Sequence, residues 1–204
     1  MSSAANRVVM NTGLKATMMR DRMLGLRLSV IEGGRDLSEV KLITPGEGNI
    51  SARVDGERFI VTPTGKDKAK LDIDDLFEIE INSHCVPEGA STEVGMHRAI
   101  YSKFPSVHSV VHAHPAKVLA LAEEGLAPDP SRLPNGGSVL DRVSWIDDFP
   151  PGTRSLANEV AIGISRAPAL VIAAHGAVTI GATVDQAVIR MIRLERLALM
   201  TRGR

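Results

Sequence analysis

The sequence contains very few residues that could form disulfide bonds or stack against aromatic ligands. Its 204 residues include a single cysteine, Cys85, so no disulfide can form within the chain, and a reducing compartment is expected. Cys85 stands in a polar, turn-like stretch, and because a lone cysteine without a placed base is weak evidence for a nucleophile, we interpret it as an ordinary thiol. Aromatic residues make up only 3%, which disfavours a surface that binds nucleobases by stacking.

The chain also lacks an excess of charge of either sign and any long apolar run. Its 24 Lys and Arg residues balance its 24 Asp and Glu residues, whereas nucleic-acid-binding proteins usually carry a strong basic excess. No apolar run approaches the roughly 20 residues of a membrane span, and no secretory signal pattern is apparent. We therefore expect a cytoplasmic protein without nucleic-acid or membrane partners. A small anionic substrate is compatible with zero net charge, because local fields do not need a global charge.

The composition that remains is typical of one globular α/β domain, which we expect to span residues 1–204. Apolar residues make up 44% and charged residues 24%, enough to build one hydrophobic core. Short strands interleaved with helices indicate a layered α/β fold. Apolar spacing predicts helices over residues 17–32, 92–104, 116–124, 153–165 and 183–200, with Thr183 as a candidate cap of the last. Short β-branched or alternating runs predict strands over residues 58–62, 76–81, 107–114 and 169–174.

Two segments rich in glycine or proline lead to further expectations. The pair Gly33-Gly34 predicts the end of the first helix, because glycine disfavours helix interiors. Residues 125–151 are rich in Pro, Gly and Asp and are long for a loop in a compact domain. Such loops are usually functional, which favours a lid or a binding loop.

Histidines are concentrated in the apolar stretch VHSVVHAHP, residues 107–115. His112 and His114 are two residues apart, so in a strand their imidazoles point to the same face, an arrangement that metal sites use. His175 ends the other strongly apolar strand and precedes a glycine, which makes it a candidate third ligand. His108 shares the strand parity of the pair, but we interpret it as a structural or surface residue, and His84 as a turn residue.

Glu93 is the carboxylate of greatest interest. It follows Ser91 and Thr92 at the start of a predicted helix, where hydroxyls and free backbone N–H groups form an anion site. Glu93 could act there as a base or a fourth metal ligand, or it could be an ordinary first-turn glutamate stabilised by the helix dipole. His97 lies one helical turn later, and we expect it to support Glu93 through an i,i+4 contact.

Six short motifs occur in an order that resembles a known family. The chain resembles the class II aldolase/adducin family, particularly its fuculose-phosphate aldolase-like enzymes, over residues 46–200. The motifs are GNIS (48–51), TPTG (62–65), STE (91–93), HAHP (112–115), PGTRSLA (151–157) and HG (175–176). Six motifs in order with compatible spacing are far more specific than any one of them.

The resemblance implies a fold, a site and an assembly. The implied fold is a three-layer α/β/α domain around a mostly antiparallel sheet, and the implied assembly is a homotetramer with sites at subunit interfaces. Glu93 would be the catalytic acid/base. The implied metal is divalent, usually Zn²⁺, with Mn²⁺, Fe²⁺ or Co²⁺ as alternatives, and its ligands would be His112, His114 and His175. The implied residues that hold a substrate phosphate are Asn49, Thr64, Gly65, Ser91 and Thr92.

The implied activity is reversible cleavage of a ketose 1-phosphate to dihydroxyacetone phosphate and an aldehyde. The metal would act as a Lewis acid that stabilises the enediolate, while Glu93 shuttles a proton. Lys66 could assist the phosphate or be a solvated turn lysine. The aldolases of the family use tyrosines from mobile segments as proton donors. The only tyrosine here, Tyr101, lies inside the helix after Glu93, so no donor is assigned.

Other members of the family provide alternatives. Sugar-phosphate decarboxylases and dehydratases share much of the same constellation and stay open. A 4-epimerase is disfavoured, because those enzymes use a further histidine and no histidine follows His175. A non-catalytic binding module of the adducin type is disfavoured by the complete set of three metal ligands.

Overall fold

The architecture is a seven-stranded sheet with helices on both faces. The computed structural model describes the backbone of residues 3–133 and 140–203, and the side chains of these ranges from Thr17 onward. The elements are α1 (Ser3–Glu39), β1 (Asn49–Arg53), β2 (Arg58–Val61), η1 (Lys68–Lys70), η2 (Ile73–Asp75), β3 (Phe77–Glu80), α2 (Val94–Lys103), β4 (Ser109–Ala113), α3 (Ala116–Glu123), η3 (Pro130–Arg132), β5 (Val143–Ile146), α4 (Arg154–Ile164), β6 (Ala169–Ile172), β7 (Gly176–Gly181) and α5 (Val184–Arg202).

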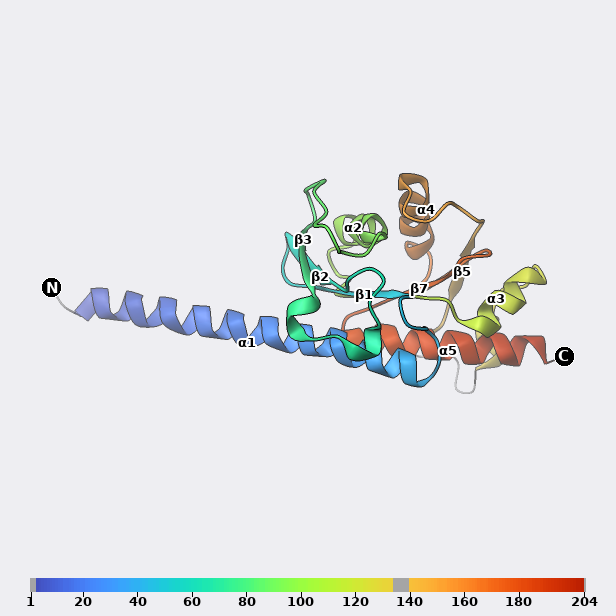
Figure 1. Cartoon of the computed structure of the whole chain (residues 1–204), viewed down its shortest axis with the longest axis horizontal. Helices are drawn as coiled ribbons and strands as arrows, with labels where there is room; N and C mark the ends of the chain where they lie inside the picture. The colour runs from blue at the N-terminus through green and yellow to red at the C-terminus, as the bar shows by residue number, and fades with distance from the viewer. Residues whose placement is uncertain (1–2, 134–139, 204) are drawn as a thin grey trace.

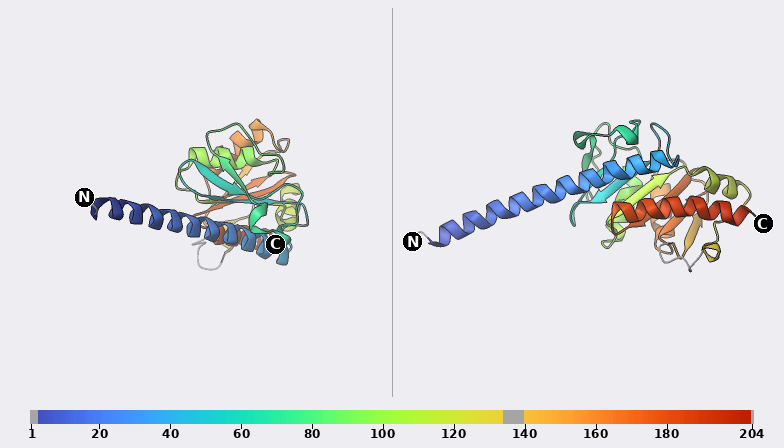
Figure 2. Two further views of the ribbon diagram at one scale, coloured as in Figure 1. Left: turned by 60° about the vertical axis from the view of Figure 1, so that its left-hand side comes forward. Right: turned by 90° about the horizontal axis from the view of Figure 1, so that it is seen from below.

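The strands lie in the order β3-β2-β1-β4-β7-β6-β5. Neighbouring strands pair antiparallel except β5 and β6, which are parallel. Helices α1 and α5 cover one face of the sheet, and α2 and α4 cover the other (Figures 1 and 2). The three-layer fold with a mostly antiparallel sheet is thus confirmed. None of the helices within the described residues has both the length and the apolar character needed to cross a membrane.

Alternation along the central strands divides the apolar side chains between two cores. Val111 on β4 packs in the core beneath α1 and α5, whereas Val110 packs in the core beneath α2 and α4. On β1, Ile50 lies in the α1/α5 core, so its neighbours Asn49 and Ser51 face α2. The strand pleat therefore directs the polar side chains of β1 towards the α2 layer.

The first helix does not end at the glycine pair, so that expectation is wrong. Helix α1 continues to Glu39 and contains both glycines. At these two positions neighbouring segments pack so close to the helix that a side chain would not fit. A Cβ atom on Gly33 would lie 2.9 Å from Val184 Cγ1, and one on Gly34 would lie 2.5 Å from the carbonyl oxygen of Lys68. Here glycine serves close packing rather than helix termination.

The C-terminal half contains strands that the sequence patterns did not reveal. The predicted strand 169–174 ends at Ile172, and the chain turns at His175 into β7, which was not predicted. The segment 125–151 is not one loop, because it contains η3 and β5, although its residues 134–139 lie outside the described part of the chain. The predicted cap at Thr183 is confirmed, since its Oγ1 accepts a hydrogen bond of 3.1 Å from the Gln186 N–H.

Two glycines of α1 provide a matched test of this packing. We expect Gly34→Ala to lower the free energy of unfolding by about 1–3 kcal/mol, because the methyl group displaces the backbone at Lys68. Gly25→Ala should instead raise it by about 0.4–1 kcal/mol, since no other segment of the described chain comes within 4 Å of the added carbon. Urea denaturation of both variants measures the difference, and equal effects would contradict the packing role of Gly34.

Candidate metal and active site

Strand register brings distant motifs of the sequence together at one edge of the domain. Asn49 on β1 lies directly opposite His112 on β4. An isolated bridge joins Pro63 to Ala90, with a hydrogen bond of 3.0 Å from the Thr64 N–H to the Gly89 carbonyl. The GNIS, TPTG, STE and HAHP segments therefore meet because of backbone pairing.

The three histidines expected to bind a metal lie in one cluster. His112 is on β4, His114 directly follows that strand, and His175 lies in the turn between β6 and β7. One ligand nitrogen from each lies within 4.8 Å of the others, and the Nε2 atoms of His112 and His114 are 3.1 Å apart. Three converging imidazoles could hold a divalent ion such as Zn²⁺.

Hydrogen bonding orients His112 towards this cluster. Its Nδ1 lies 3.0 Å from the Ala177 carbonyl oxygen, which can only accept, so Nδ1 carries the proton and Nε2 presents a lone pair. Burial lowers the pKa of His112 to about 4, which keeps the ring neutral near pH 7. Gly176 makes room for the rings, because a Cβ there would lie 2.8 Å from His114 Cδ2.

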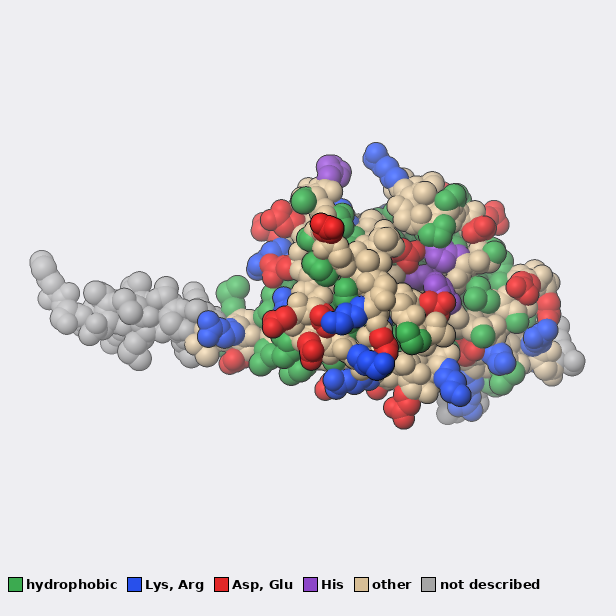
Figure 3. All heavy atoms as spheres, in the orientation of Figure 1, with side chains coloured by type: hydrophobic (Ala, Val, Ile, Leu, Met, Phe, Trp, Pro, Cys, Tyr) green, Lys and Arg blue, Asp and Glu red, His purple; other side chains and the backbone are tan. Residues whose placement is uncertain are grey.

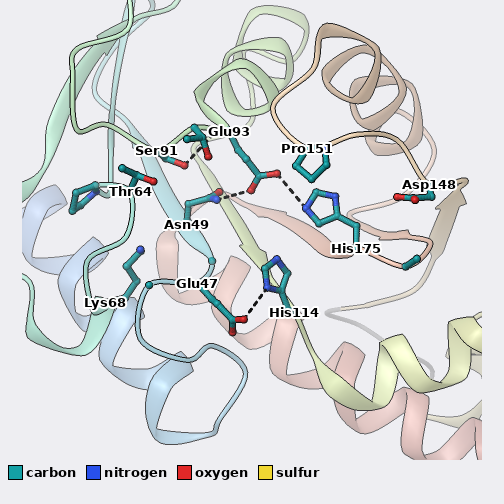
Figure 4. Close-up of a pocket in the computed structure, with 15 residues that line it drawn as sticks. Glu47, Asn49, Thr64, Lys68, Ser91, Glu93, His114, Asp148, Pro151 and His175 are labelled. Atoms are coloured by element: carbon teal, nitrogen blue, oxygen red, sulfur yellow. Dashed lines mark hydrogen bonds and ion pairs between the residues drawn. The ribbon is translucent and has the colours of Figure 1, made fainter.

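The carboxylate of Glu93 lies against the same cluster (Figure 4). Its Oε2 is 3.2 Å from His112 Nε2 and its Oε1 is 3.3 Å from His175 Nε2. Burial would raise the pKa of Glu93, but His175, His112 and the Asn49 amide together hold it well below its usual range, so the group is ionised. Glu93 Oε1 and His175 Nδ1 are buried without a hydrogen-bond partner among the described residues. A carboxylate oxygen and an imidazole nitrogen are both atom types that bind divalent metal ions, so their lack of partners beside His112 fits a metal site.

A buried row of polar side chains joined by hydrogen bonds, called the ladder here, supports Glu93. Glu93, His97 and Tyr101 are spaced four residues apart and so share one face at α2, while Asn49 and Ser51 are spaced two apart on β1. Asn49 Nδ2 donates to Glu93 at 2.8 Å, and Asn49 Oδ1 lies 2.5 Å from His97 Nε2. Ser51 Oγ lies 2.6 Å from His97 Nδ1 and 2.8 Å from the Tyr101 hydroxyl.

The ionised carboxylate at its end gives this ladder one direction. Glu93 can only accept, so Asn49 donates through Nδ2 and its Oδ1 must accept from the His97 Nε2–H. His97 Nδ1 then accepts from the Ser51 hydroxyl, which accepts from Tyr101. Burial lowers the pKa of His97 to about 3, in keeping with this neutral tautomer. His97 thus supports Glu93 through the Asn49 amide, which hydrogen-bonds to both side chains, rather than through a hydrogen bond of its own to the carboxylate.

A pocket of about 480 Å³ opens above the cluster. Figure 3 shows histidine side chains in a hollow on this face, beside acidic side chains. Of the residues expected to bind phosphate, only Gly65 does not line the pocket, and those that do are Asn49, Thr64, Ser91 and Thr92. The Ser91 hydroxyl also accepts a hydrogen bond of 3.2 Å from the Glu93 N–H.

Three charged residues to which the sequence reasoning assigned no role line the pocket wall. Glu47 has its Oε1 3.9 Å from His114 Nδ1, Asp148 follows β5, and the side chain of Lys68 is buried. Their local sequences resemble solvated loops, and only the adjacency of Glu47 to GNIS could have indicated a role. Lys66, which was considered for the phosphate, instead pairs with Asp75.

The remaining singled-out side chains lie away from the pocket. Tyr101 is buried behind β1, and no tyrosine is among the residues that line the pocket. His84, His108 and Cys85 are exposed, as expected for turn, surface and loop residues.

Known proteins are similar to this chain in sequence and in fold. A family profile described as the Class II Aldolase and Adducin N-terminal domain matches residues 29–201. The crystal structure of an l-fuculose-1-phosphate aldolase from Thermus thermophilus is similar, with a TM-score of 0.77 and 30% identity over 86% of this chain and 92% of that one.

Curated relatives carry out different reactions. A methylthioribulose-1-phosphate dehydratase of Pectobacterium carotovorum subsp. carotovorum is 32% identical over 69% of this chain and 75% of its own length. A 3-oxo-tetronate 4-phosphate decarboxylase of Haemophilus influenzae is 28% identical over 83% of each chain. Similarity at this level therefore identifies the family without selecting one reaction.

The neutral His97 predicts a pH dependence of stability. Its folded pKa of about 3 lies below the ordinary value of 6.5, so between these values the unfolded chain binds more protons and stability falls as pH falls. One such group contributes at most about 1.4 kcal/mol per pH unit. We expect His97→Gln to reduce this slope between pH 6 and 4, whereas exposed His84→Gln should not. Urea denaturation with chelator present measures both, and an unchanged slope in His97→Gln would contradict the assignment.

Proposed function

This chain belongs to the class II aldolase/adducin family, and on that premise we propose that it is a metal-dependent lyase that reversibly cleaves a ketose 1-phosphate to dihydroxyacetone phosphate and an aldehyde. The observation that carries the proposal is the convergence of three imidazoles and one ionised carboxylate in a cluster whose members His114, His175 and Glu93 line one pocket. Neutral hydrogen-bond donors line another part of the same pocket. A metal site, an acid/base and an anion site are three of the features that metal-dependent cleavage of a sugar phosphate uses.

His112, His114 and His175 are the proposed metal ligands, with Zn²⁺ as the first choice among divalent ions. The neutral His112 supports this role, because its free Nε2 faces the other two rings and needs no proton removed. A divalent ion held there would act as a Lewis acid on the substrate's carbonyl and hydroxyl oxygens.

Glu93 is the proposed acid/base. Cleavage breaks the bond between C3 and C4 of the ketose, the C4 hydroxyl loses its proton, and C3 gains one to complete dihydroxyacetone phosphate. Glu93 would exchange the proton at C3, since its Oε1 is buried beside the cluster and has no hydrogen-bond partner among the described residues. The ladder through Asn49 and His97 would hold the carboxylate in place for this transfer.

The phosphate group is proposed to lie among the short polar side chains of the pocket. Thr64 and Thr92 are exposed at the pocket wall, and Ser91 and Asn49 lie deeper, towards Glu93. Gly65 would contribute through its backbone N–H beside Thr64, with a positive φ of 64° that allows the tight turn. Such donors bind an anion without adding groups that titrate near neutral pH.

Dehydration or decarboxylation of a sugar phosphate is the second candidate. One observation favours it: the only tyrosine of the chain is fully buried in the ladder behind β1, so it cannot donate a proton in the pocket. Asp148 and Glu47 are the carboxyl groups of the pocket wall that could protonate a leaving group instead. A 4-epimerase or an adducin-like binding module has no such observation in its favour.

We also propose that the chain assembles as a homotetramer with sites at subunit interfaces. Helix α1 supports this, because it extends beyond the sheet (Figure 1) and carries exposed apolar side chains. Met18, Met19, Leu24 and Leu28 are each more than two-fifths exposed, which favours coverage by another chain.

Substitutions at Glu93 and His114 separate the proposed roles. We expect Glu93→Gln to retain bound metal and to lower kcat by about 10²- to 10⁴-fold, because the amide cannot transfer the proton. His114→Ala should lose both metal and turnover. Exposed Glu88→Gln is the control and should match the parent protein. Metal analysis and steady-state kinetics report both properties, and an active Glu93→Gln enzyme would refute the acid/base role.

Product analysis distinguishes the candidate reactions. The protein is treated with chelator, reloaded with Zn²⁺ or Mn²⁺, and assayed against a panel of ketose 1-phosphates and phosphorylated sugar acids. An aldolase releases dihydroxyacetone phosphate and an aldehyde, a decarboxylase releases carbon dioxide, and a dehydratase loses water with the carbon chain intact. We expect the first outcome. Exclusive water loss or carbon dioxide release would replace it with the second candidate, and the absence of turnover with every metal would refute the lyase.

A further inference from the structure

One buried cation in the pocket wall has no ion-pair partner among the described residues. The residue Lys68 is only 1% exposed, yet it lines the same pocket as the histidine cluster. Its Nζ donates one hydrogen bond of 2.9 Å, to the carbonyl oxygen of Lys66. Within the described residues, no carboxylate oxygen lies within ion-pair distance of this ammonium.

The neighbouring lysines of the same segment are satisfied at the surface. Lys66 pairs with Asp75, and Lys70 pairs with Asp67 at 3.1 Å while its side chain is 80% exposed. Lys68 differs because α1 packs directly on its backbone at Gly34, where no Cβ atom would fit. The close approach of α1 therefore buries this one lysine of the three.

An ammonium buried in this way destabilises the ligand-free protein. Removal of an ammonium from water costs free energy, and one carbonyl together with the Asp67 carboxylate, which lies beyond ion-pair distance, offsets this cost only in part. Burial accordingly lowers the pKa of Lys68. Residues that oppose folding in this way are typical of functional sites, where a ligand supplies the missing partner.

The position of Lys68 indicates which ligand this is. Figure 4 shows its ammonium directed into the pocket, near Thr64 and Asn49 and away from His175. Lys68 is the only Lys or Arg among the described residues that line this pocket, whereas Glu47, Glu93 and Asp148 line it with negative charge. An anionic group would meet net repulsion from the side chains there unless it lay beside Lys68.

We propose that Lys68 binds the phosphate group of the substrate through its ammonium and makes the enzyme specific for phosphorylated over neutral sugars. This inference rests on the proposed function and deepens it, because the other proposed phosphate donors are neutral hydroxyl and amide groups. The phosphate supplies the buried ammonium with a counter-ion, and the ammonium supplies the only full positive charge that a side chain of this wall offers to the phosphate.

Binding of inorganic phosphate to the metal-loaded protein tests the inference without any turnover. We expect Lys68→Met to weaken phosphate binding by about 10- to 100-fold in titration calorimetry, the range for a lost charge-assisted hydrogen bond. Exposed Lys70→Met removes the same charge from the same segment and should bind phosphate within twofold of the parent. The Tm of phosphate-free Lys68→Met should equal or exceed that of the parent, because the variant lacks an unpaired buried charge.

Further variants and substrates keep the test decisive. Lys68→Gln retains a donor for the Lys66 carbonyl, so it replaces Lys68→Met if that variant does not fold, and the same loss of affinity is expected.

With a sugar phosphate that the parent cleaves, KM should rise and the preference for it over its dephosphorylated analogue should fall by the same factor. Phosphate affinity within twofold of the parent in both neutral variants would overturn the role of Lys68. If the parent turns over no sugar phosphate, the proposed function fails, and phosphate binding still decides Lys68 by itself.

Discussion

The hydrogen bond between Asn49 and Glu93 is the interaction on which the site depends. It ties the N-cap residue of α2 to a central strand of the sheet, and it exists because antiparallel pairing puts Asn49 opposite His112. The same carboxylate then lies 3.2 Å from His112 Nε2. Burial would raise the pKa of Glu93, and the Asn49 amide acts together with His175 and His112 to hold that pKa well below its usual range. The amide thus helps to keep the carboxylate ionised, and it fixes the orientation of the carboxylate.

Close backbone approach is the second constraint, and it explains why small residues occur where they do. Gly176 allows the β6–β7 turn to lie against the rings of His112 and His114, so the third histidine can reach the pair. Gly34 allows α1 to lie on the segment that carries Lys68. At both positions a methyl group in place of the glycine hydrogen would push these neighbouring segments apart. The packing of the backbone therefore decides which side chains reach the pocket.

Much of the fold and of the candidate site could be predicted from the sequence, and the failures have physical causes. The pair His112 and His114 follows from strand periodicity, and the cap at Thr183 from local hydrogen bonding. Lys68 could not be found, because the run KDKAK reads as a solvated charged turn and only the packing of α1 buries one lysine of it. Strand β7 was missed because the turn at His175 interrupts two apolar runs that pair with each other only in the sheet.

The sequence by itself determined the family, the layered α/β class and the identity of the clustered histidines, because ordered motifs and strand periodicity are properties of local sequence. Only the tertiary structure decided how those parts act on one another. It set the direction of the hydrogen-bond ladder from Tyr101 to Glu93, and it put the Asn49 amide between His97 and that carboxylate. It also buried Lys68 in the pocket wall without an ion-pair partner in the described part of the chain. These relations depend on residues far apart in the chain that meet through strand pairing and helix packing, which no local pattern in the sequence encodes.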